Sequence, residues 1–244
     1  AGAALAALHR IAEKRADHGG VASIRNVIAI DGDELARHGA LDAVRVQRWR
    51  SASLDAIGRH AALLESRRES GFVRRCHGDA HLGNFVLWEG RATLFDAIEF
   101  NDDFAVIDTF YDMAFLLMDM WERHHPALAN AAFNAYLAAT GDLGGVALLP
   151  LFLSARASVR AHVSLSMAAV QADQARAAAL RRDAGDYLES ALAFLHPPPP
   201  ILVAIGGLSG TGKSSLARVL APAIGPAPGA VVLRSDVVRK QLAG

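Results

Sequence analysis

The sequence is poor in cysteine, poor in lysine and without net charge, and each scarcity excludes a class of protein. A single cysteine, Cys76, among 244 residues rules out an internal disulfide and is typical of a reducing compartment. The 25 basic residues balance 25 acidic ones, which argues against a general nucleic-acid or membrane-surface binder. Only three basic residues are lysines, Lys14, Lys213 and Lys240, so a lysine inside a motif is informative.

Long apolar runs are also lacking. The longest charge-free apolar stretch, LGGVALLPLFLSA, ends before Arg156 and falls short of the ~20 residues that cross a bilayer. No basic start is followed by an apolar signal region, so we expect a cytoplasmic protein without a membrane partner. Hydrophobic residues make up 52% of the chain, enough for a core in one large domain or two modest ones.

The spacing of apolar residues predicts a mainly helical chain with one short strand-rich section. Helical patterns run over residues 1–17, about 41–70, 107–124, and in two or three further segments to 195, with breaks near 141–145 and 150. The runs FVRRC, FVLW and ATLF predict strands, the last two forming a hairpin around Gly90. Four prolines predict an extended linker at 196–200, between one domain at 1–195 and another at 201–244.

After the linker, the sequence reads as the opening of a parallel α/β unit. ILVAI and VVLRSD predict buried strands on either side of a glycine-rich turn and a helix, and the unit stops at Gly244 before it could close. GLSGTGKS at 207–214 fits the P-loop pattern, in which backbone N–H groups and a helix N-terminus hold phosphates. Lys213 would reach the phosphates of ATP, and Ser214 would bind Mg²⁺. The predicted nucleotide-binding residues are Gly207, Gly210, Gly212, Lys213, Ser214 and Ser215.

A second polar motif, HGDAHLGN at 77–84, lies between predicted strands. Phosphoryl transfer needs a group that orients the attacking hydroxyl and hard oxygen ligands for Mg²⁺. Asp79 suits the first role. Asn84 and Asp96 suit the second, because the hairpin folds Asp96 back beside the loop.

Two other interpretations of this motif stay open. His77, Asp79 and His81 stand at alternate positions, as the ligands of a zinc or iron hydrolase would in a strand. The motif is also compatible with a polar loop held by its own hydrogen bonds. The hydrolase interpretation leaves the glycines and the hairpin to Asp96 unexplained, and a loop of purely structural role rarely needs two histidines.

The segment CHGDAHLGNFVLWEGRATLFD resembles the catalytic loop and metal-binding hairpin of the aminoglycoside phosphotransferase and choline kinase-like family, which shares the protein-kinase fold. The resemblance covers residues 1 to about 195 as the helical C-terminal lobe, and it implies an α+β fold. It implies Asp79 as the catalytic base, with Asn84 and Asp96 as Mg²⁺ ligands and His77 as a residue that braces the loop. Gly78 stands where protein kinases have arginine, which favours a small-molecule acceptor.

Further residues follow from the same resemblance. Asp112 in YDMAFL is expected to brace the catalytic loop from beneath, whereas Asp108 could be structural or functional. Glu99 is a candidate substrate-binding residue, although its spacing from Asp96 departs from the family pattern. By helical spacing alone, Arg156 and Arg160 could line a substrate pocket, but the solvated face of an amphipathic helix is the favoured interpretation.

The segment LRSDVVRK resembles P-loop kinases of the polynucleotide kinase and gluconate kinase type. That resemblance implies Asp236 as the residue that activates an acceptor hydroxyl and Arg239 as a substrate-binding residue. Asp236 as a simple helix cap is the alternative. The two parts in this order resemble bifunctional aminoglycoside phosphotransferase/ATP-binding proteins.

Together these patterns predict an ATP- and Mg²⁺-dependent kinase that acts on a hydroxyl of a small molecule. The alternative from a different class is a ligand-sensing first part that regulates the P-loop part. Before His77 the only lysine, Lys14, lies in a helical pattern, whereas a kinase active site needs a strand lysine. We therefore expect a fragment of low activity, which the start at Ala1 also indicates. The sequence indicates neither the acceptor nor an oligomeric state.

Overall fold

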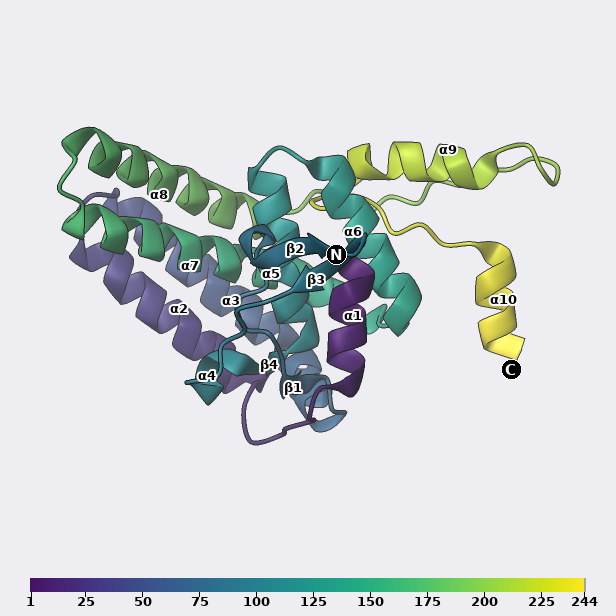
Figure 1. The fold of residues 1–244 in the computed structure, drawn as a ribbon, viewed down its shortest axis with the longest axis horizontal. Coiled ribbons are helices and arrows are strands. Elements are labelled where there is room, and N and C mark those ends of the chain that lie inside the picture. Colours follow the sequence, from purple (N-terminus) through teal and green to yellow (C-terminus); the bar gives the residue numbers. More distant parts are fainter. Residues whose placement is uncertain (244) are drawn as a thin grey trace.

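The computed structural model describes residues 1–243, which are mainly helical with two small antiparallel sheets (Figure 1). The helices are α1 (Gly2–Ile11), α2 (Gly20–Arg37), α3 (Ala43–Glu69), α4 (Asp102–Ala105), α5 (Thr109–Glu122), α6 (Pro126–Thr140), α7 (Leu149–Val170), α8 (Gln174–Phe194), α9 (Lys213–Leu220) and α10 (Ser235–Ala243), with short 3₁₀ turns η1 (Leu82–Asn84), η2 (Gly144–Leu148) and η3 (Ala221–Ala223). The strands are β1 (Val73–Arg75), β2 (Phe85–Trp88), β3 (Arg91–Leu94) and β4 (Val106–Asp108). This arrangement agrees with an α+β kinase-like lobe.

Helices α5 and α7 form the centre of the core. Every residue of α5 from Thr109 to Met120 is buried, because α5 packs against α1, α6 and α7, and a helix that is apolar on all sides must be covered on all sides. Helix α7 packs against α2, α5 and α8 (Figure 1). The stretch Gly144–Val170 is long and apolar enough to cross a membrane by composition, but most of it is buried inside the protein, as in the core helix of a globular domain.

The strands place the polar loop at the edge of this core. β1 pairs with β4, with Val73 opposite Asp108, and the Cys76 N–H continues this pairing by donating to the Ala105 carbonyl at 2.7 Å. β2 and β3 form the hairpin around Gly90, whose φ is 74°. The predicted strands in FVRRC, FVLW and ATLF are therefore confirmed.

Helix α2 was not predicted. Its sequence, GVASIRNVIAIDGDELAR, mixes β-branched residues, a glycine and acidic residues, which individually favour helix only weakly. Four residues at helical spacing, Ile24, Ile28, Asp31 and Leu35, are buried, and the helix packs on α3 and α7. Tertiary packing therefore outweighs local propensity.

The two strands predicted after the linker are wrong. Residues 201–205 and 231–234 form neither helix nor strand, and Leu202 is 94% exposed. A strand is stable only when its backbone groups pair with a neighbour, and neither run has such a partner among the described residues. Helices α9 and α10 lie where helices were predicted, but the parallel α/β unit is not formed. The domain boundaries at 195 and 201 stay predictions.

The chain after η3 is fastened to α6 by Asn130 and Asn134, which we term the asparagine clamp. Both side-chain amides donate to the Ala230 carbonyl, at 3.0 and 3.1 Å, and Asn134 Oδ1 accepts from the Val232 N–H at 2.7 Å. Val231, between these two residues, packs on the core. The C-terminal part thus touches the helical part through a specific hydrogen-bonded contact.

Candidate active site

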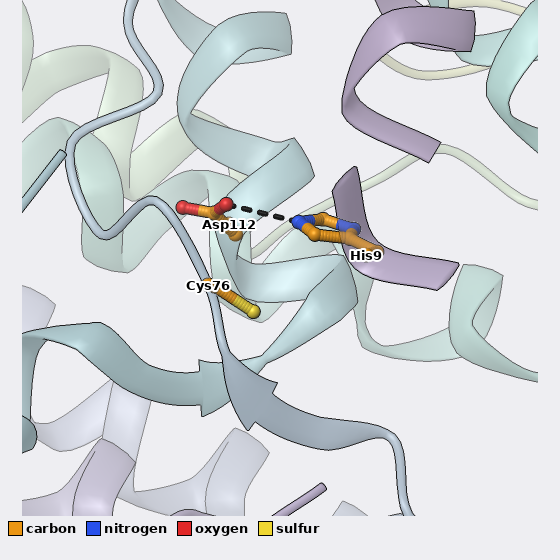
Figure 2. Close-up of side chains that lie close together, drawn as sticks. All are labelled: His9, Cys76 and Asp112. Atoms are coloured by element: carbon orange, nitrogen blue, oxygen red, sulfur yellow. Dashed lines mark hydrogen bonds and ion pairs between the residues drawn. The ribbon is translucent and has the colours of Figure 1, made fainter. Parts of the chain in front are cut away.

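The loop at 77–84 is fixed from beneath by Asp112 of α5. The Gly78 N–H donates to Asp112 Oδ1 at 3.0 Å, and the His77 N–H donates to Asp112 Oδ2 at 3.2 Å. The ring of His9, from α1, contacts Oδ2 at 3.0 Å from the opposite side (Figure 2). Asp112 is fully buried, so these contacts compensate the cost of removing its charge from water. Asp112 braces the loop, as the resemblance implied.

Asp79 and Asn84 lie in direct contact within this loop. Asn84 Nδ2 donates to the Asp79 carbonyl at 2.8 Å and to Asp79 Oδ2 at 3.0 Å. His81 Nδ1 accepts the Gly83 N–H at 3.0 Å, so the ring proton is on Nε2, which lies 3.4 Å from the same Oδ2. One oxygen of Asp79 is therefore held by two side chains. Among the described residues, no hydrogen bond is made by the other oxygen.

The surroundings of Asp79 keep its carboxyl ionised. Partial burial raises the pKa of Asp79, but the interaction with His81, the charge of Arg156 and the hydrogen bond from Asn84 lower it. The lowering effects prevail, and the pKa of Asp79 lies below its ordinary value. Asp79 is therefore an anion near neutral pH that accepts hydrogen bonds.

His77 joins the loop to the end of the hairpin, where Asp96 stands. His77 Nε2 donates to the Phe95 carbonyl at 2.8 Å, and the Ile98 N–H donates to the His77 carbonyl at 2.9 Å. The Phe95 N–H also donates to the Asn84 carbonyl at 3.1 Å. These bonds tie the chain on both sides of Asp96 to the loop.

Asp96 itself is exposed and has a left-handed backbone, with φ at 62°. Aspartate enters this region more readily than most residues, but such conformations are uncommon and cluster at functional sites. Among the described residues, the carboxylate of Asp96 makes no hydrogen bond. Together with the amide oxygen of Asn84 it offers hard oxygen atoms, which fit Mg²⁺.

The hydrolase interpretation is wrong, because His77, Asp79 and His81 do not form a metal cluster. His77 is turned to the Phe95 carbonyl, and His81 Nδ1 already accepts a backbone N–H. Within residues 1–243, a cluster of this type is formed only by His9, Cys76 and Asp112, whose ligand atoms lie within 4.8 Å of one another.

The residues of this second cluster are tied to their neighbours by hydrogen bonds. His9 Nδ1 lies 2.9 Å from the Tyr136 hydroxyl, and the Cys76 thiol donates to the Ile107 carbonyl at 3.4 Å. Burial raises the pKa of Cys76 well above its ordinary value, which favours the protonated thiol that donates this bond. Figure 2 shows the Asp112 carboxylate pointing at the His9 ring.

Arg156 is not on a solvated face, and that prediction is wrong. Its side chain is 6% exposed, and Nε donates to the Tyr111 carbonyl at 3.1 Å. Helix α7 is covered on several sides, so an arginine at a position that looked solvated points into the protein.

Asp108 has a structural role, since it caps α5 and pairs with the buried Arg67 at 2.8 Å.

The remaining predicted site residues do not join the loop. Glu99 is exposed, and its carbonyl rather than its carboxylate faces Arg75, at 3.5 Å. Asp236 pairs with Arg234 at 2.7 Å, and this hydrogen bond lowers the pKa of Asp236. Asp236 and Arg239 were expected to act in the P-loop part rather than at this loop, and that assignment stays a prediction.

The glycine-rich turn has the backbone of a tight loop that opens a helix. The φ angles of Gly207, Gly210 and Gly212 are 145°, 79° and 83°, a region that glycine adopts without steric cost. Helix α9 begins at Lys213, with Gly212 as its N-cap. Lys213 Nζ donates to the Leu208 carbonyl inside the turn, and Ser214 and Ser215 form the first turn of the helix.

Comparison with known proteins identifies the family of the first part. Residues 1–149 match the phosphotransferase enzyme family, a range that includes the loop and the hairpin. Uncharacterised proteins of Mycobacterium tuberculosis and Mycobacterium bovis are 31% identical over 180 residues, which are 74% of this chain and 34% of theirs. The chain thus spans about a third of the length of the curated relatives it matches. No solved structure matches, and the P-loop part gains no support from the family match. The chain belongs to the phosphotransferase enzyme family.

Proposed function

We propose that the loop at 77–84 is the catalytic loop of an ATP-dependent kinase, in which Asp79 aligns a hydroxyl of a small molecule for attack on the γ-phosphoryl group. One observation carries this proposal. Oδ2 of Asp79 is fixed by Asn84 and His81, while the other oxygen is free of hydrogen bonds within the described residues and the side chain is 38% exposed. A carboxylate held in this way can accept a hydrogen bond from an incoming hydroxyl in one defined direction.

The low pKa of Asp79 fits this role. An ionised carboxylate is a weak base towards an alcohol, so it orients the hydroxyl and accepts the proton late, after the bond to the leaving group has largely broken. Positioning then contributes more than basicity. The brace from Asp112 and the contact with Asn84 supply that positioning.

Asn84 and Asp96 are the residues that would hold Mg²⁺. When bound, the ion would neutralise charge on the phosphates of ATP. The amide of Asn84 already commits its N–H₂ group to Asp79, which leaves the amide oxygen for a ligand. His77 holds the chain next to Asp96 through the Phe95 carbonyl.

The variant Asp79→Asn tests the proposal in the full protein. An asparagine at this position keeps the size of the side chain but cannot accept the proton. We expect phosphoryl transfer from labelled ATP to a panel of hydroxyl metabolites to fall by about 10²–10⁴-fold, with ATP binding retained. Asp183→Asn, which changes an exposed carboxylate on α8, is the control. Unchanged turnover in Asp79→Asn would refute the assignment.

We further propose a second phosphate-binding site at Gly207–Ser215. The positive φ angles of three motif glycines and the start of α9 at Lys213 support it, because such a turn directs backbone N–H groups towards an anion. In Lys213→Ala, ATP consumption at this site should be lost while transfer that depends on Asp79 persists. If Lys213→Ala alone abolishes all ATP consumption, the first part is a sensor rather than a kinase.

A further inference from the structure

Arg156 is a buried cation beneath the catalytic loop, and its burial needs an explanation. It comes from the middle of α7, and its guanidinium lies between two aromatic rings of α5, 3.8 Å from the ring centroid of Tyr111 and 4.7 Å from that of Phe115. Such stacking stabilises a cation and fixes the plane of the group. The rings therefore hold Arg156 in one orientation.

The hydrogen bonds of Arg156 are incomplete. Nε donates to the Tyr111 carbonyl at 3.1 Å, but the buried Nη2 has no hydrogen-bond partner. Asp112 Oδ1 lies 3.9 Å from Nη2 and forms an ion pair with it. A buried donor left without a partner costs free energy. Packing of the core alone therefore does not explain why Arg156 is buried.

The Asp112 oxygen that faces Arg156 is also the one that fixes the catalytic loop. Oδ1 accepts the Gly78 N–H at 3.0 Å, and Gly78 directly precedes Asp79. The ring of His9 contacts the other oxygen, Oδ2. Each oxygen of Asp112 thus has one basic side chain beside it, and Arg156 serves the oxygen on the Gly78 side.

The charge of Arg156 reaches several groups at once. It opposes the effect of burial on the pKa of Asp112 and contributes to the low pKa of Asp79. It also lowers the pKa of Asp31 on α2, although burial raises that pKa more strongly. The titratable groups that face Arg156 are Asp31, Cys76, Asp79, Tyr111 and Asp112.

We propose that Arg156 is a positioning residue for the catalytic loop, which it holds through the Asp112 carboxylate that accepts the Gly78 N–H. Its importance for catalysis rests on the proposed kinase function, but its effect on the loop does not. Arg156 does not touch the acceptor, because it lies behind Asp112 in the core. A smaller or neutral side chain would leave Asp112 Oδ1 without a positive charge beside it.

The experiment measures the loop directly, without any need for turnover. Amide hydrogen exchange of Gly78 is followed in the full chain, beside that of His77, whose N–H donates to the other oxygen of Asp112. Arg156→Met and Arg156→Gln remove the charge, and Arg156→Lys keeps it. Arg160→Met is the matched control, since Arg160 lies one turn further on α7 and faces the ring of Tyr187 at 5.8 Å.

In both neutral variants we expect exchange of the Gly78 amide to accelerate by about tenfold, as loss of a charge-assisted contact would produce. Arg156→Lys should restore slow exchange of the Gly78 amide, and Arg160→Met should leave this exchange unchanged. If one neutral variant does not fold, the other gives the answer, and Arg156→Lys reports on charge alone. The proposal is overturned if the folded neutral variants leave exchange of the Gly78 amide unchanged, or if Arg160→Met accelerates it equally. Loss of turnover in Asp79→Asn tests the kinase function separately.

Discussion

Gly78 lies against the backbone of Phe104, so closely that a Cβ on Gly78 would stand 2.8 Å from the Phe104 carbonyl oxygen. The φ of Gly78 is also 83°, which other residues rarely adopt. Glycine is therefore required twice in the residue before Asp79, by backbone conformation and by space.

Replacement of Gly78 by alanine should lower the free energy of unfolding by about 2–4 kcal/mol, since both the strained backbone and the close contact contribute. Urea denaturation measures this loss. Gly90→Ala is the matched control: its φ is 74°, but nothing lies within 4 Å of its added Cβ, so only the conformational cost of about 1–2 kcal/mol applies. Equal losses in the two variants would mean that the contact with Phe104 is unimportant.

Asp112→Asn should destabilise the protein by about 3 kcal/mol, because an amide cannot accept hydrogen bonds at both former oxygen positions inside the core. Thermal or urea unfolding gives the magnitude. Asp119→Asn serves for comparison, because that buried carboxylate of the same helix accepts from the Leu82 N–H but does not reach Gly78. Faster exchange of the Gly78 amide in Asp112→Asn, and not in Asp119→Asn, would identify the loop as the affected region.

The stability difference between the unaltered protein and Asp112→Asn should depend on pH. Burial raises the pKa of Asp112, but the hydrogen bond and charge of His9, with Arg156 and His77, lower it below the ordinary value. A carboxyl with a lowered pKa in the folded state contributes stability above its unfolded value of about 3.9, and this contribution is lost as the pH falls through the folded value. The difference should be constant near neutral pH and should narrow below about pH 4. A constant difference down to the acid transition would contradict this assignment.

His81→Ala should raise the pKa of Asp79, because it removes an interaction that lowers this pKa while the effect of burial persists. In the full protein, the acid limb of the activity profile should move to higher pH, and the carboxyl titration should follow it. His125→Ala, which alters an exposed histidine before α6, should leave both profiles in place. A shift in activity without a shift in the Asp79 titration would assign the limb to another group.

Asn134→Ala should loosen the chain at Val232, whose N–H donates to Asn134 Oδ1 at 2.7 Å. We expect the Val232 amide to exchange about tenfold faster, whereas the amides of α5 should keep their protection. Asn26→Ala, on the exposed side of α2, is the control. Unchanged exchange at Val232 would show that packing of Val231 alone holds the segment.

The sequence predicts the elements of this fold well where a local pattern is strong. The hairpin around Gly90 and the helix at 109–122 follow from alternation and from an apolar run. Helix α2 escapes prediction because its residues favour helix only once α3 and α7 cover Ile24 and Ile28. Strands at 201–205 are expected from composition but lack neighbours, and no local pattern reports the absence of a partner.

The candidate site also contains residues that a local motif reveals and residues that only the fold brings together. Asp79 and Asn84 are recognisable because both lie within one short motif and contact each other. Arg156 and His9 are remote in sequence from that motif and meet Asp112 only through the packing of α1 and α7 on α5. Spacing along a helix does not reveal such groups, because arginine and histidine at these positions look like surface residues.

The asparagine clamp has a practical consequence for the design of truncated versions of this protein. Composition places the boundary in the proline run, but truncation there would strip Ala230 and Val232 from α6 and leave the amides of Asn130 and Asn134 facing water beside an uncovered apolar strip. A shortened version that retains the chain through Leu233 keeps those amides occupied, and it should stay soluble and resist proteases better than one cut at the prolines.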